Sequence, residues 1–222
     1  MSDVYAVIFD MDGVLIDTYH AHYRSWLAMA EPEGLHYSEQ EFAGTFGRTS
    51  REIIASLWRD RHFTEEQIAE LDAKKEAAFR RIIEKDFPAM PGVRPLLRSL
   101  HEAEFKLAVG SSGPPENVEL MLQKLDARGL FGAAITAGDV TRGKPDPQVF
   151  LLAAERLGVP PERCAVVEDA PVGIAAAHAA GMKAIGLVST GRTREQLREA
   201  DLVVDRLDQL TPDTMRRLLT AV

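Results

Sequence analysis

Short apolar runs recur along the chain at intervals that suit an alternation of strands and helices. The first run begins at Val4 and is continuously apolar to Phe9, and its β-branched and aromatic side chains are typical of a strand buried on both faces. Similar runs occur at 105–110, 133–136, 164–167, 184–188 and 202–204, and segments with helical spacing lie between most of them, at 93–103, 115–125, 147–157 and 172–180. This alternation predicts βαβ crossovers, and therefore an α/β fold with a doubly wound, mostly parallel, Rossmann-like sheet.

One long segment breaks the alternation directly after the first strand. Residues 17–88 contain no strand-like run, and their helical pattern carries three capping boxes, at Ser38-x-x-Glu41, Thr49-x-x-Glu52 and Thr64-x-x-Gln67. A segment of this length does not fit a crossover helix. We therefore predict two domains: a sheet domain of residues 1–16 and 89–222, and an inserted α-helical domain of residues 17–88.

Composition and charge narrow the class of protein. The chain has 222 residues, of which 45% are hydrophobic and 27% charged, as in ordinary soluble globular proteins. Its formal net charge of −8 disfavours nucleic acid and anionic membrane surfaces as partners, so an anionic ligand requires a local basic pocket.

The sequence also gives expectations about location and assembly. Cys164 is the single cysteine, no apolar run approaches the roughly 20 residues of a membrane span, and Met1 to Asp10 contains no basic segment of a secretory signal. We expect a cytoplasmic enzyme or binding protein. Because no edge for strand pairing is obvious from the sequence, we also expect a monomer.

Polar residues that could take part in catalysis or bind a metal follow several of the predicted strands. Asp10 and Asp12 follow the first strand, Ser111 the second, and Glu168 and Asp169 the strand that begins at Cys164, while Lys144 lies in the Gly- and Pro-rich segment 142–147. Ligands of open α/β sheets bind at the carboxyl ends of the strands, so these side chains are expected at one sheet edge. Crowded carboxylates require a nearby cation, and oxygen ligands without His or Cys favour Mg²⁺.

These residue types fit phosphoryl transfer. Lys144 and Ser111 suit phosphate oxygens, as a fixed positive charge and as a hydrogen-bond donor. Asp10 could attack phosphorus as a nucleophile and give an acyl phosphate. Asp12 would protonate the leaving oxygen and then activate the acceptor.

These residues form four motifs that follow one another along the chain: Asp10-Met11-Asp12-Gly13-Val14, Ser111, Lys144 in Gly-Lys-Pro-Asp-Pro, and Glu168-Asp169 followed by Gly173. With these four motifs in this order, the chain resembles the haloacid dehalogenase superfamily, in the branch that includes β-phosphoglucomutase and small-metabolite phosphatases. The resemblance implies an aspartyl-phosphate mechanism, with Mg²⁺ held by the Asp10 side chain, the Asp12 backbone carbonyl and Asp169. It leaves open whether Glu168 binds the metal directly or supports the residues that bind it. It also implies that residues 17–88 form a helical cap that closes over the site.

Each motif also has a purely structural interpretation. The Asp10 to Gly13 segment could be a turn, Ser111 could cap a helix, and Lys144 could be a solvated surface charge. Two adjacent acids, Glu168 and Asp169, could favour the helix that follows them. The four motifs together favour the catalytic interpretation. The acid at position 12 argues against the dehalogenase-like and phosphonate-cleaving relatives, which lack it.

The helical segment contains three candidate substrate-binding residues. His22 resembles the cap histidine of the mutase branch, and Lys75 lies where the helical stripe calls for an apolar residue, at the place of a substrate-binding lysine in that branch. Arg51 lies in a first helical turn, where a nearby anion would offset the unfavourable helix dipole. The segment 47–51 resembles the specificity loop in the cap of the mutase branch through Ser50 and Arg51. It departs from that pattern at Gly47 and Arg48, where the mutase has a lysine before its loop glycine.

We therefore predict a Mg²⁺-dependent phosphatase that acts on a small phosphorylated metabolite, a sugar phosphate above all. A sugar phosphomutase of the β-phosphoglucomutase type is the alternative, because it differs only in the acceptor that meets the phosphorylated aspartate. A non-catalytic phosphate-sensing protein is a minor alternative. It predicts a broken catalytic position, yet Asp10, Asp12, Ser111, Lys144 and Asp169 are all present.

Overall fold

The computed structural model describes residues 4–221 and divides into two compact units. Met1–Asp17 together with Ala89–Val222 form one unit, called here the sheet unit, and Thr18–Pro88 form the other, called the helical unit. Each is described by itself.

Within residues 4–221, the sheet unit is built on six parallel strands in the order β3-β2-β1-β4-β5-β6. The strands are β1 (Ala6–Phe9), β2 (Lys106–Gly110), β3 (Phe131–Ile135), β4 (Cys164–Glu168), β5 (Lys183–Leu187) and β6 (Leu202–Val204). The strand order reverses at β1, because β2 and β3 lie on one side of it and β4, β5 and β6 on the other. In a doubly wound sheet this reversal opens a crevice at the carboxyl ends of β1 and β4.

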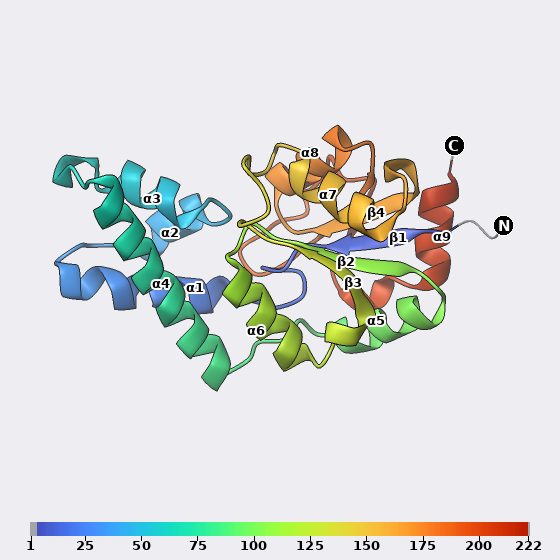
Figure 1. Cartoon of the computed structure of the whole chain (residues 1–222), viewed down its shortest axis with the longest axis horizontal. Helices are drawn as coiled ribbons and strands as arrows, with labels where there is room; N and C mark the ends of the chain where they lie inside the picture. Colours follow the sequence, from blue (N-terminus) through green and yellow to red (C-terminus); the bar gives the residue numbers. More distant parts are fainter. Residues whose placement is uncertain (1–3, 222) are drawn as a thin grey trace. The chain divides into compact units, whose positions relative to one another are not determined.

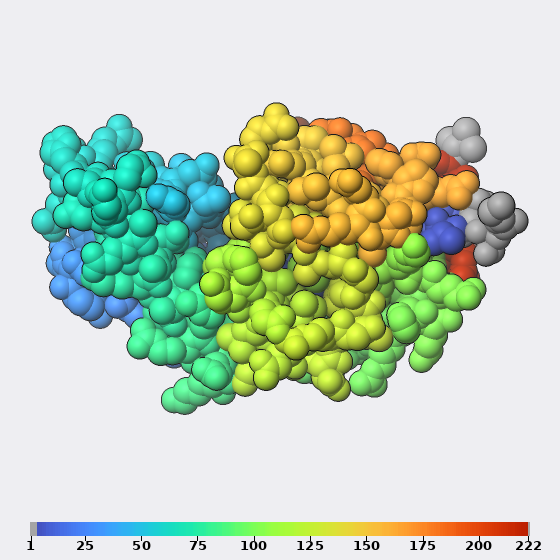
Figure 2. Space-filling model, in the orientation of Figure 1, coloured from blue at the N-terminus to red at the C-terminus, as the bar shows by residue number. Residues whose placement is uncertain are grey.

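Helices cover both faces of this sheet, as predicted. They are α5 (Val93–Glu102), α6 (Pro115–Leu125), α7 (Gln148–Leu157), α8 (Pro171–Ala179) and α9 (Pro212–Thr220). Figure 1 shows α7 and α8 on one face and α5 on the other. All four residues of β1 have no exposed surface. In the space-filling view, segments coloured green to orange, which follow this strand in the sequence, form most of the surface of the sheet unit on this side (Figure 2). Burial on both faces explains why the strands are continuously apolar.

Two details of the sheet differ from the sequence expectation. β3 begins at Phe131, two residues before the predicted 133, because the chain also pairs with β2 across a register shift between Leu107 and Ala108. The sheet is open, with β3 and β6 at its edges, whereas no edge for pairing was expected. Apolar patterning did not reveal these edges, since it identifies strands without ordering them.

The helical unit consists of α1 (Tyr19–Ala30), α2 (Glu39–Thr45), α3 (Ser50–Leu57) and α4 (Glu65–Lys85), with short 3₁₀ segments between some of them. All three predicted capping boxes form, at Ser38, Thr49 and Thr64. An aromatic-rich core around Trp26 holds the unit together. None of the helices within residues 4–221 combines the length and apolarity needed to cross a membrane.

Candidate active site

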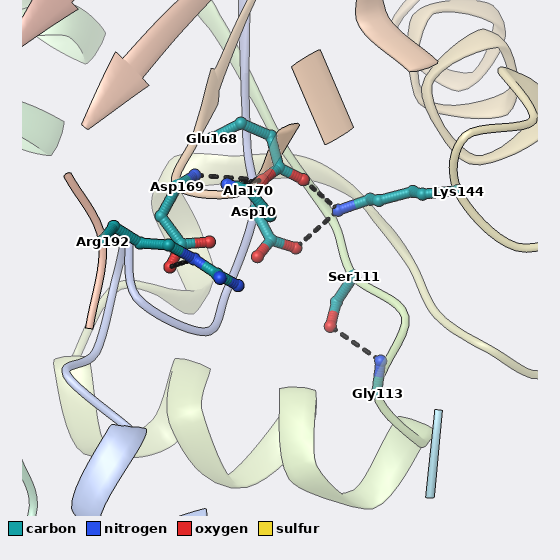
Figure 3. Close-up of polar contacts among 8 residues, drawn as sticks. All are labelled: Asp10, Ser111, Gly113, Lys144, Glu168, Asp169, Ala170 and Arg192. Atoms are coloured by element: carbon teal, nitrogen blue, oxygen red, sulfur yellow. Dashed lines mark hydrogen bonds and ion pairs between the residues drawn. The ribbon is translucent and has the colours of Figure 1, made fainter. Parts of the chain in front are cut away.

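Acidic side chains meet at the strand reversal. Asp10 directly follows β1, Glu168 is the last residue of the neighbouring β4, and Asp169 follows it, so the parallel pairing brings these acids to one sheet edge (Figure 3). All three are buried, with at most 8% of each residue exposed. Ser111 follows β2, on the other side of β1, and so reaches the same edge.

Lys144 joins two of these carboxylates. Its Nζ atom donates to Asp10 Oδ1 at 2.7 Å and to Glu168 Oε1 at 2.5 Å, with 7% of the lysine side chain exposed. Burial alone would lower the pKa of Lys144, but Asp10 and Glu168 outweigh it and raise the pKa above its ordinary value. The lysine is therefore a fixed cation within the acidic cluster.

Glu168 is held by the backbone as well as by Lys144. Its Oε2 atom accepts hydrogen bonds from the amides of Asp169 and Ala170, each at 3.0 Å. Gly173, in the first turn of α8, leaves room for this carboxylate, because a Cβ atom there would lie 1.9 Å from Glu168 Oε1. Both oxygens of Glu168 are thus engaged within the protein.

The acidic cluster fits a divalent cation. One oxygen from each of Asp10, Glu168 and Asp169 can be chosen so that all three lie within 4.8 Å of one another. Burial raises the pKa of Asp10 well above its ordinary value, against the opposing effect of Lys144, and burial followed by Glu168 raises the pKa of Asp169 to about 7. Buried carboxylates with raised pKa values gain most from a bound cation, so the cluster could hold a metal.

Asp12 and Ser111 contribute differently from these acids. The Asp12 side chain is half-buried and lies outside the three-carboxylate cluster, although its charge contributes to the raised pKa of Asp10. Ser111 is fully buried, and its hydroxyl oxygen accepts a hydrogen bond from the amide of Gly113 at 3.0 Å. This is a local turn interaction and not the helix cap considered for this serine, because α6 begins after Pro114 without a side-chain cap.

The segment after β5 completes the surroundings of Asp169. Ser189 Oγ donates to Asp169 Oδ2 at 2.8 Å, and Arg192 Nε lies 3.7 Å from the same oxygen. Gly13 approaches from the first motif with φ +76°, and a Cβ atom there would lie 2.1 Å from Asp169 Oδ2. Sequence analysis missed Ser189 and Arg192. Applying the strand-end rule to β5 as well would have pointed to Ser189, two residues after that strand, and to the segment that contains Arg192.

The helical unit brings two of its three candidate residues together. Lys75 Nζ lies 2.9 Å from His22 Nδ1 and donates to Glu76 Oε1 at 2.7 Å, and Lys75 is 3% exposed. Arg51 is exposed and pairs instead with Glu65 at 3.4 Å, so a protein carboxylate supplies the anion that its helix position calls for. Glu76 is a partner that sequence analysis did not identify.

Comparisons with known proteins agree with this geometry. Hexitol phosphatase A of Escherichia coli K12 is 36% identical over 212 residues, which is 92% of this chain and 92% of the relative. The β-phosphoglucomutase of Bacillus subtilis strain 168 is 34% identical over 212 residues, with 93% and 91% covered.

The fold matches solved structures of the same group. The crystal structure of the β-phosphoglucomutase of Clostridium difficile superimposes with a TM-score of 0.86 at 27% identity, over 97% of each chain. The family model of haloacid dehalogenase-like hydrolases matches residues 4–181. This chain therefore belongs to the haloacid dehalogenase-like hydrolase family.

Proposed function

We propose that this protein is a Mg²⁺-dependent phosphatase of a small phosphorylated metabolite, above all a sugar phosphate, that works through phosphorylated Asp10. The observation that carries the proposal is the buried Lys144 bridge between Asp10 and Glu168 at the strand reversal. The phosphatase and mutase relatives support the same reaction class. The proposed enzyme acts as a cytoplasmic monomer.

The nucleophile in this proposal is the Asp10 carboxylate. One of its oxygens forms a bond to phosphorus while the bond from phosphorus to the ester oxygen breaks, which leaves an acyl phosphate. Asp12 gives its proton to the departing oxygen. Asp12 then accepts a proton from water as that water attacks phosphorus, and inorganic phosphate and free Asp10 are released.

Positive charge makes this chemistry possible in a buried site. The Asp10 and Asp169 side chains and the Asp12 backbone carbonyl would hold Mg²⁺, which supplies charge neutralisation for the carboxylates and the phosphoryl oxygens. Lys144 supplies a second fixed cation, and Ser111 donates to a phosphoryl oxygen. Because both Glu168 oxygens are engaged within the protein, we assign Glu168 to holding Lys144 in place.

The helical unit is the cap in this proposal. Its closure would exclude water from the acyl phosphate. It would also bring His22, Arg51 and Lys75 to the organic group of the substrate to which the phosphate is attached. The division of the chain into residues 1–16 with 89–222 and 17–88 then separates chemistry from recognition.

A sugar phosphomutase is the second candidate, because β-phosphoglucomutases are among the relatives and the solved structures. The two reactions share the phosphorylated Asp10. They differ in whether water or a sugar hydroxyl attacks it.

The test measures phosphate release and isomerisation side by side. Purified protein with Mg²⁺ is given a panel of sugar phosphates, phosphoglycolate and nucleotides, and glucose 1-phosphate isomerisation is followed with a bisphosphate primer. We expect phosphate release from one preferred substrate, with a loss of about a thousandfold or more in Asp10→Asn, because the nucleophile is removed. Primed isomerisation that outpaces phosphate release would instead establish the mutase, and unchanged turnover in Asp10→Asn would contradict both candidates.

A further inference from the structure

A tight turn follows β5 beside the acidic cluster, and the proposed function assigns it no role. We call residues 189–192 the Ser189 turn. The amide of Arg192 donates to the Ser189 carbonyl oxygen at 3.0 Å, and Gly191 has φ +81°, a value that suits the third residue of a type II turn. Because a β-turn brings its first and fourth residues close together, Ser189 and Arg192 can approach the same group.

Two hydrogen bonds anchor this turn within the sheet unit. The amide of Val188 donates to the carbonyl oxygen of Val204, on β6, at 2.9 Å. Thr190 Oγ1 donates to Asp17 Oδ2, in the segment that follows the first motif, at 2.7 Å. Both partners belong to the sheet unit, so the place of the turn is fixed by that unit alone.

The first and fourth side chains of the turn meet at one oxygen of Asp169. Ser189 Oγ donates to Asp169 Oδ2 at 2.8 Å, and Arg192 Nε lies 3.7 Å from the same oxygen, with 9% of the arginine side chain exposed (Figure 3). A separation of 3.7 Å is longer than a hydrogen bond, so across it the guanidinium acts on the carboxylate through its charge. Ser189 therefore holds the carboxylate, and Arg192 sets the field around it.

The charges around Asp169 leave room for one divalent cation. Lys144 and Arg192 are cations among the carboxylates of this site, which are Asp10, Asp12, Glu168 and Asp169. With all of them ionised, four negative charges face two positive ones, an excess of two that one divalent cation would balance. A cation that binds to Asp169 shares this carboxylate with Arg192, and the two positive charges repel each other.

We propose that Ser189 and Arg192 are positioning residues that set the affinity of the acidic cluster for its divalent cation, in opposite directions. Ser189 strengthens metal binding, because it keeps the Asp169 carboxylate in one orientation. Arg192 weakens metal binding, because its fixed charge competes with the cation for that carboxylate. The inference rests on the proposed function for the presence of a metal, and it concerns residues that the proposed function leaves unassigned.

The experiment measures binding of Mg²⁺ itself. The full-length protein is treated with EDTA and dialysed, and the dissociation constant of Mg²⁺ is measured by isothermal titration calorimetry at pH 8.5, where protons compete little for Asp169. For Arg192→Gln we expect a dissociation constant about tenfold lower than that of wild type, because a repelling charge is removed. Arg192→Lys keeps the charge, so its dissociation constant should stay within about threefold of wild type.

Ser189→Ala tests the other half of the proposal. The carboxylate of Asp169 loses a hydrogen bond that orients it, and we expect the dissociation constant to rise at least about threefold. Because alanine is smaller than serine and the backbone of the turn is unchanged, this variant keeps the test decisive if Arg192→Gln fails to fold.

Arg194→Gln is the matched control. Arg194 lies two residues beyond the turn, is exposed and pairs with Asp205 at 2.7 Å. Its substitution removes one positive charge from the same segment without touching Asp169, so the dissociation constant of Mg²⁺ should stay that of wild type.

The outcomes separate this inference from the proposed function. An Arg192→Gln dissociation constant equal to or above that of wild type overturns the inference, and so does a Ser189→Ala constant within about twofold of wild type. If the predicted shifts are found but the protein with Mg²⁺ releases no phosphate from p-nitrophenyl phosphate or from any sugar phosphate, the phosphatase proposal fails while the inference stands. If wild type binds no Mg²⁺ in the calorimeter, the inference and the proposed Mg²⁺ dependence fail together.

Discussion

The carboxylate of Asp169 shows how single residues set the behaviour of this site. Its pKa is raised to about 7, first by burial and then by Glu168, while Arg192 and Ser189 oppose the shift. The folded protein without metal therefore binds a proton at Asp169 at pH values where an unfolded chain, with an ordinary Asp pKa, has lost it.

This shift predicts a falling stability with pH in protein freed of metal. The free energy of unfolding contributed by Asp169 is fully present below the ordinary Asp pKa and is lost as pH rises towards 7, because ionising the buried group costs free energy only in the folded state. Urea unfolding of EDTA-treated protein at pH 5.0 and 7.5 measures it. We expect a decline that Asp169→Asn reduces and that Mg²⁺ offsets at pH 7.5. Equal slopes in wild type and Asp169→Asn would contradict the assignment.

At the residue scale, the sequence predicts those side chains that lie next to recognisable strand ends. Asp10 follows β1 and Glu168 ends β4, so their meeting with Lys144 in the structure was foreseeable. Ser189 could have been found by the same strand-end rule applied to β5. Glu76 could not, because its partner Ser50 lies on another helix, α3, and hydrophobic periodicity does not encode how helices pack on one another.

At the scale of elements, the first turn of α8 limits the shape of the acidic cluster. Gly173 lies so close to Glu168 that an added methyl group would overlap its carboxylate. The helix can approach β4 only because position 173 has no side chain. Because α8 packs so closely against β4, it also confines the Glu168 carboxylate, which accepts a hydrogen bond from Lys144.

Gly173→Ala should therefore damage catalysis more than stability. The methyl group would displace Glu168 and loosen the Lys144 bridge, and we expect kcat to fall at least tenfold while far-ultraviolet circular dichroism stays unchanged, since alanine favours a helix. Gly129→Ala is the control, because a Cβ atom at position 129 meets nothing within 4 Å. A kcat for Gly173→Ala within twofold of wild type would show that Glu168 does not position Lys144.

The positions of most elements could be predicted, and their ends less well. The capping boxes gave the starts of α2, α3 and α4 because each start depends on a local hydrogen bond. On α4 the helical spacing predicts one stripe, formed by Ile68, Leu71, Lys75, Ala78 and Ile82. In the structure Ile82 is half-buried, while Phe79 and Ile83 are buried. The reason is that a helical stripe wider than one row leaves the exact contact face to the packing partners.

At the scale of the whole molecule, the topology explains why distant residues form one site. Lys144 and Asp10 are 134 positions apart, yet the strand reversal at β1 brings their segments to one sheet edge. Alternating strands and helices predicted this edge, whereas the open ends of the sheet at β3 and β6 did not follow from the pattern.

The central claim is that Asp10 carries the phosphoryl group during turnover. The most direct test is a rapid acid quench of the enzyme with Mg²⁺ and its preferred sugar phosphate, followed by mass spectrometry of the peptide that contains Asp10. The account predicts a phosphoryl group on Asp10 that hydroxylamine removes, and its absence in Asp10→Asn. Rapid turnover with no phosphorylated Asp10 at any quench time, or with the label on another residue, would contradict it.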